Sequence, residues 1–118
     1  MSVLDRESFL EAAKAVKRPA REVSVAGLGQ VRVQGLTVGE RTRFEMSCME
    51  RGKVNPRELR EKLVAMCLVD EGGRRLLPDD GDRQVLSSLP AAVIEPLFDA
   101  ARELSGMTDA DVADLGNG

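Results

Sequence analysis

The sequence contains no histidine, tryptophan or tyrosine, and phenylalanine occurs at only three positions. Histidine is the side chain most often used for proton transfer near neutral pH and is the commonest metal ligand, so its absence removes the usual basis of both functions. The scarcity of aromatic rings leaves few side chains on which bases or sugars could stack. A net charge of −3 provides no broad positive field for a phosphate backbone or an anionic membrane. Composition therefore argues against an enzyme, a nucleic-acid partner and membrane attachment.

Cysteine is also scarce, because Cys48 and Cys67 are the only two and each falls within an apolar stretch. Two thiols without a CxxC spacing form neither a disulfide framework nor a zinc site. The N-terminus lacks the basic segment and apolar run of a signal peptide, and the longest apolar run, residues 63–69, is far shorter than the ~20 residues that span a bilayer. We expect two buried, reduced thiols in a cytoplasmic protein.

The first third of the chain changes from a helical to an alternating pattern. Residues 2–16 have apolar positions at helical spacing, with basic residues gathered at the end before Pro19. From there β-branched residues alternate with polar ones on both sides of Gly27 and Gly29. This pattern is typical of an antiparallel hairpin, which we place at about residues 22–34.

Two helices with recognisable starts are predicted next. Thr37 and Glu40 have the spacing of a capping box and predict a helix over residues 38–50, with Gly52 as its C-terminal cap. Asn55 and Pro56 then suit the cap and first position of a helix over residues 56–69. The last turns of this second helix are apolar nearly all round, which predicts the central core helix.

The C-terminal third holds a long helical period over residues 86–104 and a short one after it. Pro90 suits a first turn and Gly106 a C-terminal cap, whereas Pro96 predicts a kink or break near Glu95. Thr108 can cap a short helix before a frayed end. We therefore predict an α+β, mainly helical single domain: residues 1–107, including the N-terminal helix, form one compact unit, and residues 108–118 form the short helix and tail.

The acidic and glycine-rich stretch "VDEGGRRLLPDDGD", residues 69–82, contains the residue types found in metal and phosphate sites. Calcium-loop spacing fails whether the loop starts at Asp70 or at Asp80, and no Gly-Lys followed by Ser or Thr is present. No motif joins a Ser or Cys nucleophile to a base, so no catalytic residue is assigned. We interpret the stretch as a tight turn, a short extended piece and an acidic cap, and expect no metal and no cofactor.

An alternative function comes from the two central helices, which superficially form a helix-turn-helix across "RGKVN". Arg57, Arg60 and Lys62 lie on the second helix, where a DNA-binding regulator would carry its recognition residues. That helix is also the most apolar in the chain, whereas a recognition helix must present a polar face. The regulator is therefore kept as the alternative hypothesis.

The order of segments resembles the tail assembly chaperones of long-tailed, siphovirus-type bacteriophages or prophages. The resemblance is carried by "VSVAGLGQVRVQGLTVGER", "KLVAMCLVDEGGRRLLPDD" and "LSSLPAAVIEPLFDAARELSGM", which together cover about residues 22–107. It implies a non-catalytic protein that binds the tape measure protein, keeps it soluble and helps the tail tube protein polymerise around it. It also implies a transient presence in the host cytoplasm, with no copy in the mature virion, and in many members a longer form made by ribosomal frameshifting.

A chaperone for amphipathic helices requires adaptable apolar surface, which methionine supplies well. The candidate partner-binding residues are Met46, Met49, Met66, Leu97, Phe98 and Met107. The alternative for each of them is a place in the hydrophobic core. Since several copies are needed along one long client, we also expect self-association.

Overall fold

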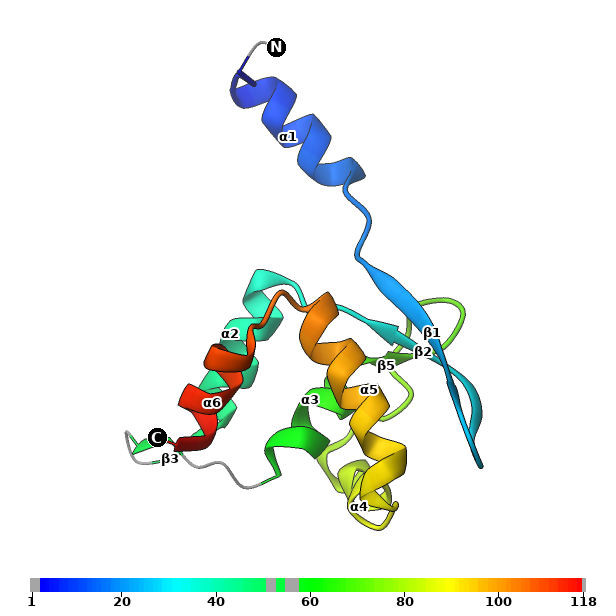
Figure 1. Cartoon of the computed structure of the whole chain (residues 1–118). Helices are drawn as coiled ribbons and strands as arrows, with labels where there is room; N and C mark the ends of the chain where they lie inside the picture. The colour runs from blue at the N-terminus through cyan, green and yellow to red at the C-terminus, as the bar shows by residue number, and fades with distance from the viewer. Residues whose placement is uncertain (1–2, 51–52, 55–57, 118) are drawn as a thin grey trace.

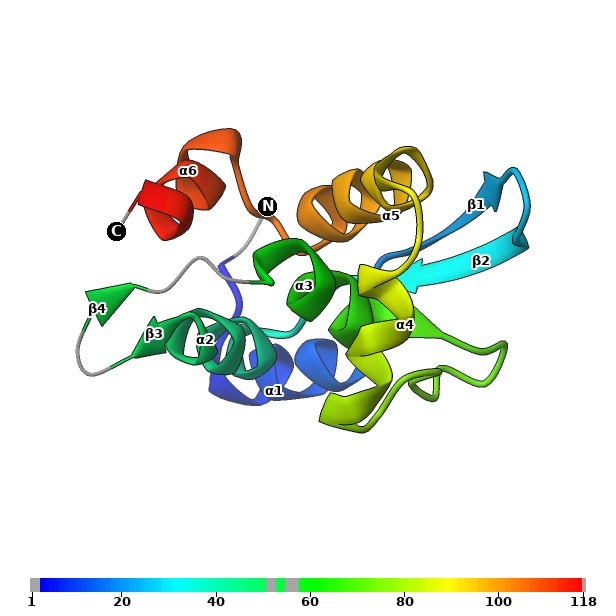
Figure 2. The same cartoon turned by 90° about the horizontal axis from the view of Figure 1, so that it is seen from below.

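The computed structural model describes residues 3–50, 53–54 and 58–117. A compact body is formed by a small sheet and most of the helices, and the first helix, α1 (Arg6–Ala15), projects away from it (Figure 1). The α+β, mainly helical fold class is confirmed. Figure 2 shows the hairpin at one end of the body and the C-terminal helix at the other, with two core helices between them.

The sheet has three antiparallel strands in the order β1 (Ala20–Val25), β2 (Gly29–Gln34) and β5 (Leu68–Val69). The predicted hairpin is confirmed: Val23 pairs with Val31, and Gly27 and Gly29 have φ of 90° and 105° in and beside the turn. Its valines face the core, where Val33 is fully buried. The third strand was not predicted, because Leu68 and Val69 were expected to end a helix and instead pair with Val33 and Arg32.

The core lies between this sheet and two helices, α3 (Leu59–Cys67) and α5 (Ala91–Leu104). The prediction of a central core helix is confirmed, since Leu63, Val64 and Cys67 on α3 are fully buried. α5 packs on both α3 and the hairpin strands. The predicted cap at Asn55 and Pro56 and the predicted C-cap at Gly52 lie outside the described residues.

The long C-terminal period forms two helices, α4 (Arg83–Ser87) and α5, with Pro90 as the N-cap of α5. Of the kink or break expected near Glu95, the break is wrong, because α5 continues through Pro96. Both Pro96 and Ala92, four residues earlier, are exposed, so the carbonyl that loses its helical partner lies on the solvent side. Gly106 ends α5 as predicted, with φ of 71° and its N–H donating to Glu103 O at 3.1 Å.

The remaining helices are α2 (Val38–Ser47), whose predicted capping box between Thr37 and Glu40 is present, and α6 (Asp109–Asn117). α6 begins after Thr108 as predicted and includes two of the residues expected to fray. The two-residue strands β3 (Met49–Glu50) and β4 (Lys53–Val54) pair with each other as a separate antiparallel sheet. The prediction that the N-terminal helix packs into the domain is wrong, because α1 buries none of its residues.

Candidate protein-binding surface

The six residues predicted to bind a partner divide into a buried and an exposed group. Leu97, Phe98 and Met107 have only 1%, 5% and 3% of their surface exposed. Their assignment to a binding surface is wrong: Leu97 and Phe98 lie on the buried face of α5, and Met107 packs into the core after the end of α5. Met66 is half-buried beside the core.

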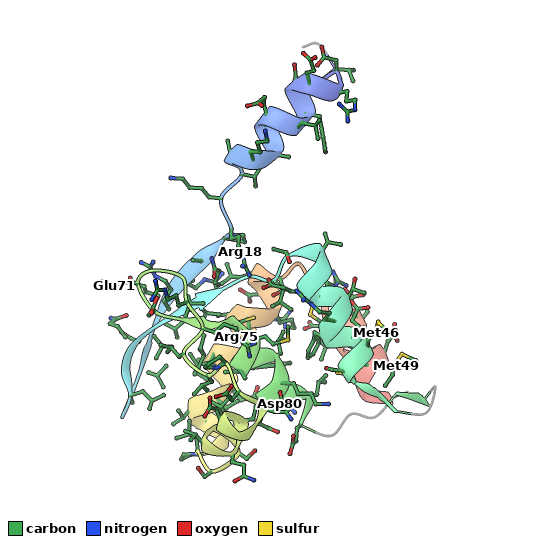
Figure 3. The ribbon with its side chains drawn as sticks, turned by 180° about the vertical axis from the view of Figure 1, so that it is seen from behind. Arg18, Met46, Met49, Glu71, Arg75 and Asp80 are labelled. Carbon is green, nitrogen blue, oxygen red and sulfur yellow. The ribbon has the colours of Figure 1, made fainter. Side chains whose placement is uncertain are left out.

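Met46 and Met49 are the exposed members, at 66% and 48% of their surface (Figure 3). Met46 belongs to one row of α2, because Val38, Thr42 and Met46 recur every four residues along the helix. Met49 follows shortly after the helix, in β3. Val38 is 86% exposed. We call these four residues the α2 stripe. Its opposite face anchors the helix, since Phe44 and Cys48 are fully buried.

The sequence analysis did not place Val38 on a binding surface. The i, i+4, i+8 spacing with Met46 was the available signal. What the spacing does not reveal is which of the two apolar rows of α2 faces the core. That choice depends on the core that Phe44 and Cys48 join, most of whose residues are remote in sequence.

The α2 stripe has an acidic edge on the side of α6. Arg41 Nε donates to Glu45 Oε1 at 2.9 Å, and its Nη2 lies 3.4 Å from Asp111 Oδ2. Asp111 is held by a capping box, in which its carboxylate accepts the Thr108 N–H at 2.9 Å. That hydrogen bond is the main reason why the pKa of Asp111 lies below its usual value. Asp114, from the same helix, lines a hollow with Glu45 and Asp111.

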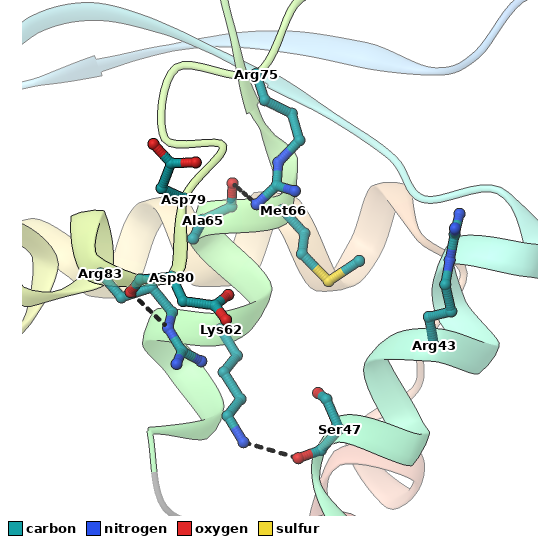
Figure 4. Close-up of a pocket in the computed structure, with 9 residues that line it drawn as sticks. All are labelled: Arg43, Ser47, Lys62, Ala65, Met66, Arg75, Asp79, Asp80 and Arg83. Atoms are coloured by element: carbon teal, nitrogen blue, oxygen red, sulfur yellow. Dashed lines mark hydrogen bonds between the residues drawn. The ribbon is translucent and has the colours of Figure 1, made fainter.

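The other edge of the stripe carries Arg43 and borders a groove of about 200 Å³ between α2, α3 and residues 75–83 (Figure 4). Three of the four cations that line it donate to backbone carbonyls. Lys62 Nζ donates to Ser47 O at 2.8 Å, Arg75 Nη2 to Ala65 O at 3.3 Å and Arg83 Nε to Asp80 O at 3.3 Å. These three side chains therefore serve to hold neighbouring elements together and do not converge on a ligand position in the groove.

The acidic stretch is a turn and a cap, as predicted. Asp70 Oδ1 accepts the N–H groups of Gly72 and Arg74 at 2.8 and 3.0 Å. Arg75 then forms an isolated antiparallel β-bridge with Val69. The Asp79 N–H donates to Asp82 Oδ2 at 3.2 Å at the turn before α4. Over residues 3–50, 53–54 and 58–117, no group of His, Cys, Asp and Glu side chains is arranged to hold a metal ion.

Over the residues that the structure describes, α2 and α3 do not have the helix-turn-helix geometry of the alternative hypothesis. α2 ends at Ser47 and α3 begins at Leu59, and the β3–β4 pairing lies between them in place of a turn of three or four residues. Arg60 on α3 pairs with Glu95 at 2.8 Å and lies over the Phe98 ring, 5.3 Å from its centroid. Arg57 lies outside the described residues.

Both cysteines are free and buried, as predicted. Burial raises the pKa of the Cys67 thiol from 9.0 to about 11, even though Ser105 Oγ lies 3.9 Å from its sulfur. Burial is also the main cause that raises the pKa of Cys48. A thiol that holds its proton in this way is a poor nucleophile, so these cysteines act as core residues.

A second apolar surface lies on α1, and sequence reasoning assigned it no binding role. Phe9, Leu10, Ala13 and Val16 lie on one side of this helix and its C-terminal end, and we call them the α1 face. Phe9 is 60% and Val16 75% exposed. Glu11 lies outside this face and pairs with Lys14 at 3.4 Å.

Searches against known protein families, curated proteins and solved structures give no significant match to this chain. Within the part of the chain that the structure describes, no helix has the length and apolarity required to cross a membrane.

Proposed function

We propose that this chain is a tail assembly chaperone of a long-tailed bacteriophage or prophage. It acts by binding rather than by catalysis: it holds the tape measure protein in solution in the host cytoplasm and assists the tail tube protein to polymerise around it. The chaperone then leaves, so it is absent from the mature virion. The segment order quoted above supports this family, and the exposed apolar surfaces support a protein-binding role.

The observation that carries the proposal is the unpartnered α2 stripe on a well-packed body. Val38, Met46 and Met49 are exposed, whereas Phe44 and Cys48 are buried in the core. The stripe therefore does not contribute to the core. An apolar row along a helix accepts the apolar face of an amphipathic helix. Methionine side chains adapt to helices of different sequence, which suits a long client that presents many similar segments.

Co-expression with the tape measure protein encoded by the following gene tests the proposal. We expect the long protein to be soluble and to co-purify with the wild-type chain. Met46→Glu with Met49→Glu should abolish both effects, because each charge faces an apolar client. Leu28→Glu is the matched control, since Leu28 is 49% exposed but lies in the hairpin turn.

Circular dichroism and the melting temperature establish that each variant is folded. A tape measure protein that stays insoluble with the folded wild-type chain would overturn the proposal. If the Leu28 variant fails as completely as the Met46 and Met49 variant, the assignment of the α2 stripe is wrong.

A further inference from the structure

The two long sides of the α2 stripe differ in charge, and this difference limits which helix can lie on it. We infer that the client segment bound there is an amphipathic helix with a basic edge, in which lysine or arginine residues beside the apolar face lie over α6. The inference rests on the proposed function and adds the charge of the client segment to it. It is carried by the order of charged residues around α2 and by the packing of α6.

Carboxylates lie along the α6 side of the stripe. Glu45 follows Val38 by seven residues, or two helical turns, so the two lie on nearly the same side of α2. Arg41, next to Glu45 around the helix, pairs with it at 2.9 Å and with Asp111 at 3.4 Å. Together with Asp114, three carboxylates and one guanidinium line the hollow between α2 and α6, an excess of two negative charges. This side of the stripe is therefore acidic even though Arg41 lies within it.

These carboxylates are held in place and still reach solvent. The side chains of Glu45 and Asp111 are 44% and 40% exposed. Asp111 is fixed by the two hydrogen bonds that it exchanges with Thr108, at 2.9 and 3.1 Å. Val112 and Leu115 seat α6 on the body, because both pack against the core. A carboxylate can accept further hydrogen bonds, so a client cation can bind here without first ordering these side chains.

The opposite side of the stripe carries an exposed cation, Arg43. Arg43 precedes Met46 by three residues and lies beside the stripe, on the side away from Glu45. Client cations on that side would approach a like charge, whereas the same cations over α6 meet carboxylates. The two sides therefore select both the sign of the client's charged edge and the side on which that edge lies.

Synthetic peptides provide the probe. Each has a leucine and methionine face and about eighteen residues, long enough to form a helix, and the positions beside the face are lysine, glutamine or glutamate. A peptide can lie on the stripe in either direction, so a single charged edge can always be turned towards α6. Fluorescence anisotropy with the full chain should show the lysine peptide binding about five to ten times more tightly than the glutamate peptide. This preference should shrink as the salt concentration rises from about 0.05 M to about 0.5 M, because salt screens exposed charges.

Glu45→Gln combined with Asp114→Asn tests the source of the preference, and both changes keep the size of the side chain. The charges that remain in the hollow cancel, so the lysine and glutamate peptides should bind within about twofold of each other. The glutamine peptide should bind as it does to the wild-type chain. Glu22→Gln combined with Glu71→Gln is the matched control, because it removes the same charge beside the hairpin, where Glu71 lies far from Met46 (Figure 3). Circular dichroism establishes that both variants are folded.

An equal or reversed preference of the wild-type chain would overturn the inference and leave the chaperone proposal standing, because the stripe would still accept an apolar helix. A preference that persists in the Glu45 and Asp114 variant, or that the control variant also loses, would overturn it too. So would binding of no peptide by a chain that keeps the tape measure protein soluble. If light scattering shows that the chain alone forms a pair that Met46→Glu separates, a second copy occupies the stripe and the inference is wrong.

Discussion

Gly35 lies directly against Leu104, so close that a Cβ on Gly35 would overlap the Leu104 carbonyl oxygen and approach the Pro19 ring to 3.1 Å. This contact joins the end of β2 to the last turn of α5. It also fixes the Gly35 carbonyl that accepts both Nε and Nη2 of Arg18. One glycine therefore sets the distance between the sheet, α5 and the Arg18 side chain that follows α1.

Gly35→Ala should lower the free energy of unfolding by about 1–3 kcal/mol, because the added methyl group meets backbone that cannot yield as a side chain would. Gly39→Ala is the control of the same chemistry. Gly39 lies in the first turns of α2 with no atom near a new Cβ, so the change should stabilise by about 0.5–1 kcal/mol. Urea unfolding measures both. Equal effects of the two substitutions would show that Gly35 is not closely packed.

Ser105 provides a second junction at this place, because its Oγ accepts the Leu36 N–H at 3.0 Å while only 8% of the residue is exposed. Ser105→Ala should lower the free energy of unfolding by about 1–3 kcal/mol, since the Leu36 N–H loses its acceptor in a buried setting. Ser88→Ala, which removes an exposed hydroxyl, should cost much less. Hydrogen exchange of the Leu36 amide should accelerate in the Ser105 variant, and unchanged exchange would contradict the expected role.

The sequence was sufficient where structure is encoded locally. Thr37 and Glu40 form their capping box from neighbouring residues, and Gly106 ends α5 through hydrogen bonds within a few positions. The hairpin followed from alternation around two glycines. Such elements depend on backbone preferences and nearby partners, which a single sequence displays directly.

Contacts between segments that are distant in the chain could not be predicted from the sequence. Leu68 and Val69 are apolar enough to end a helix, and only their pairing with Val33 and Arg32 makes them a strand. No local pattern marks Gly35, because the need for a missing side chain there comes from Leu104. Likewise, Met46 and Met107 are the same residue type, yet the folded protein exposes one and buries the other in the core.

The exposed position of α1 predicts a sharp contrast between two phenylalanines. Phe44 is fully buried, so Phe44→Ala should destabilise by about 3–5 kcal/mol through lost burial and the cavity left behind. Phe9→Ala should change the free energy of unfolding of the isolated chain by less than about 0.5 kcal/mol. Thermal unfolding at low protein concentration measures both. A large loss in the Phe9 variant under those conditions would mean that α1 packs on its own body.

The raised pKa of Cys67 predicts a loss of stability at alkaline pH. In the unfolded chain the thiol ionises near its ordinary value of 9.0, whereas in the folded protein it does so at about 11. The stabilising contribution is therefore fully present below pH 9 and is lost as the pH rises to about 11, because the unfolded state releases its proton first. The loss should be on the order of 2–3 kcal/mol. No tyrosine contributes to the pH dependence in this range, because the chain contains none. Urea unfolding at a series of pH values measures it, with Cys67→Ala as the reference. That variant starts less stable but should show a shallower decline, and parallel declines in the two proteins would contradict the assignment to Cys67.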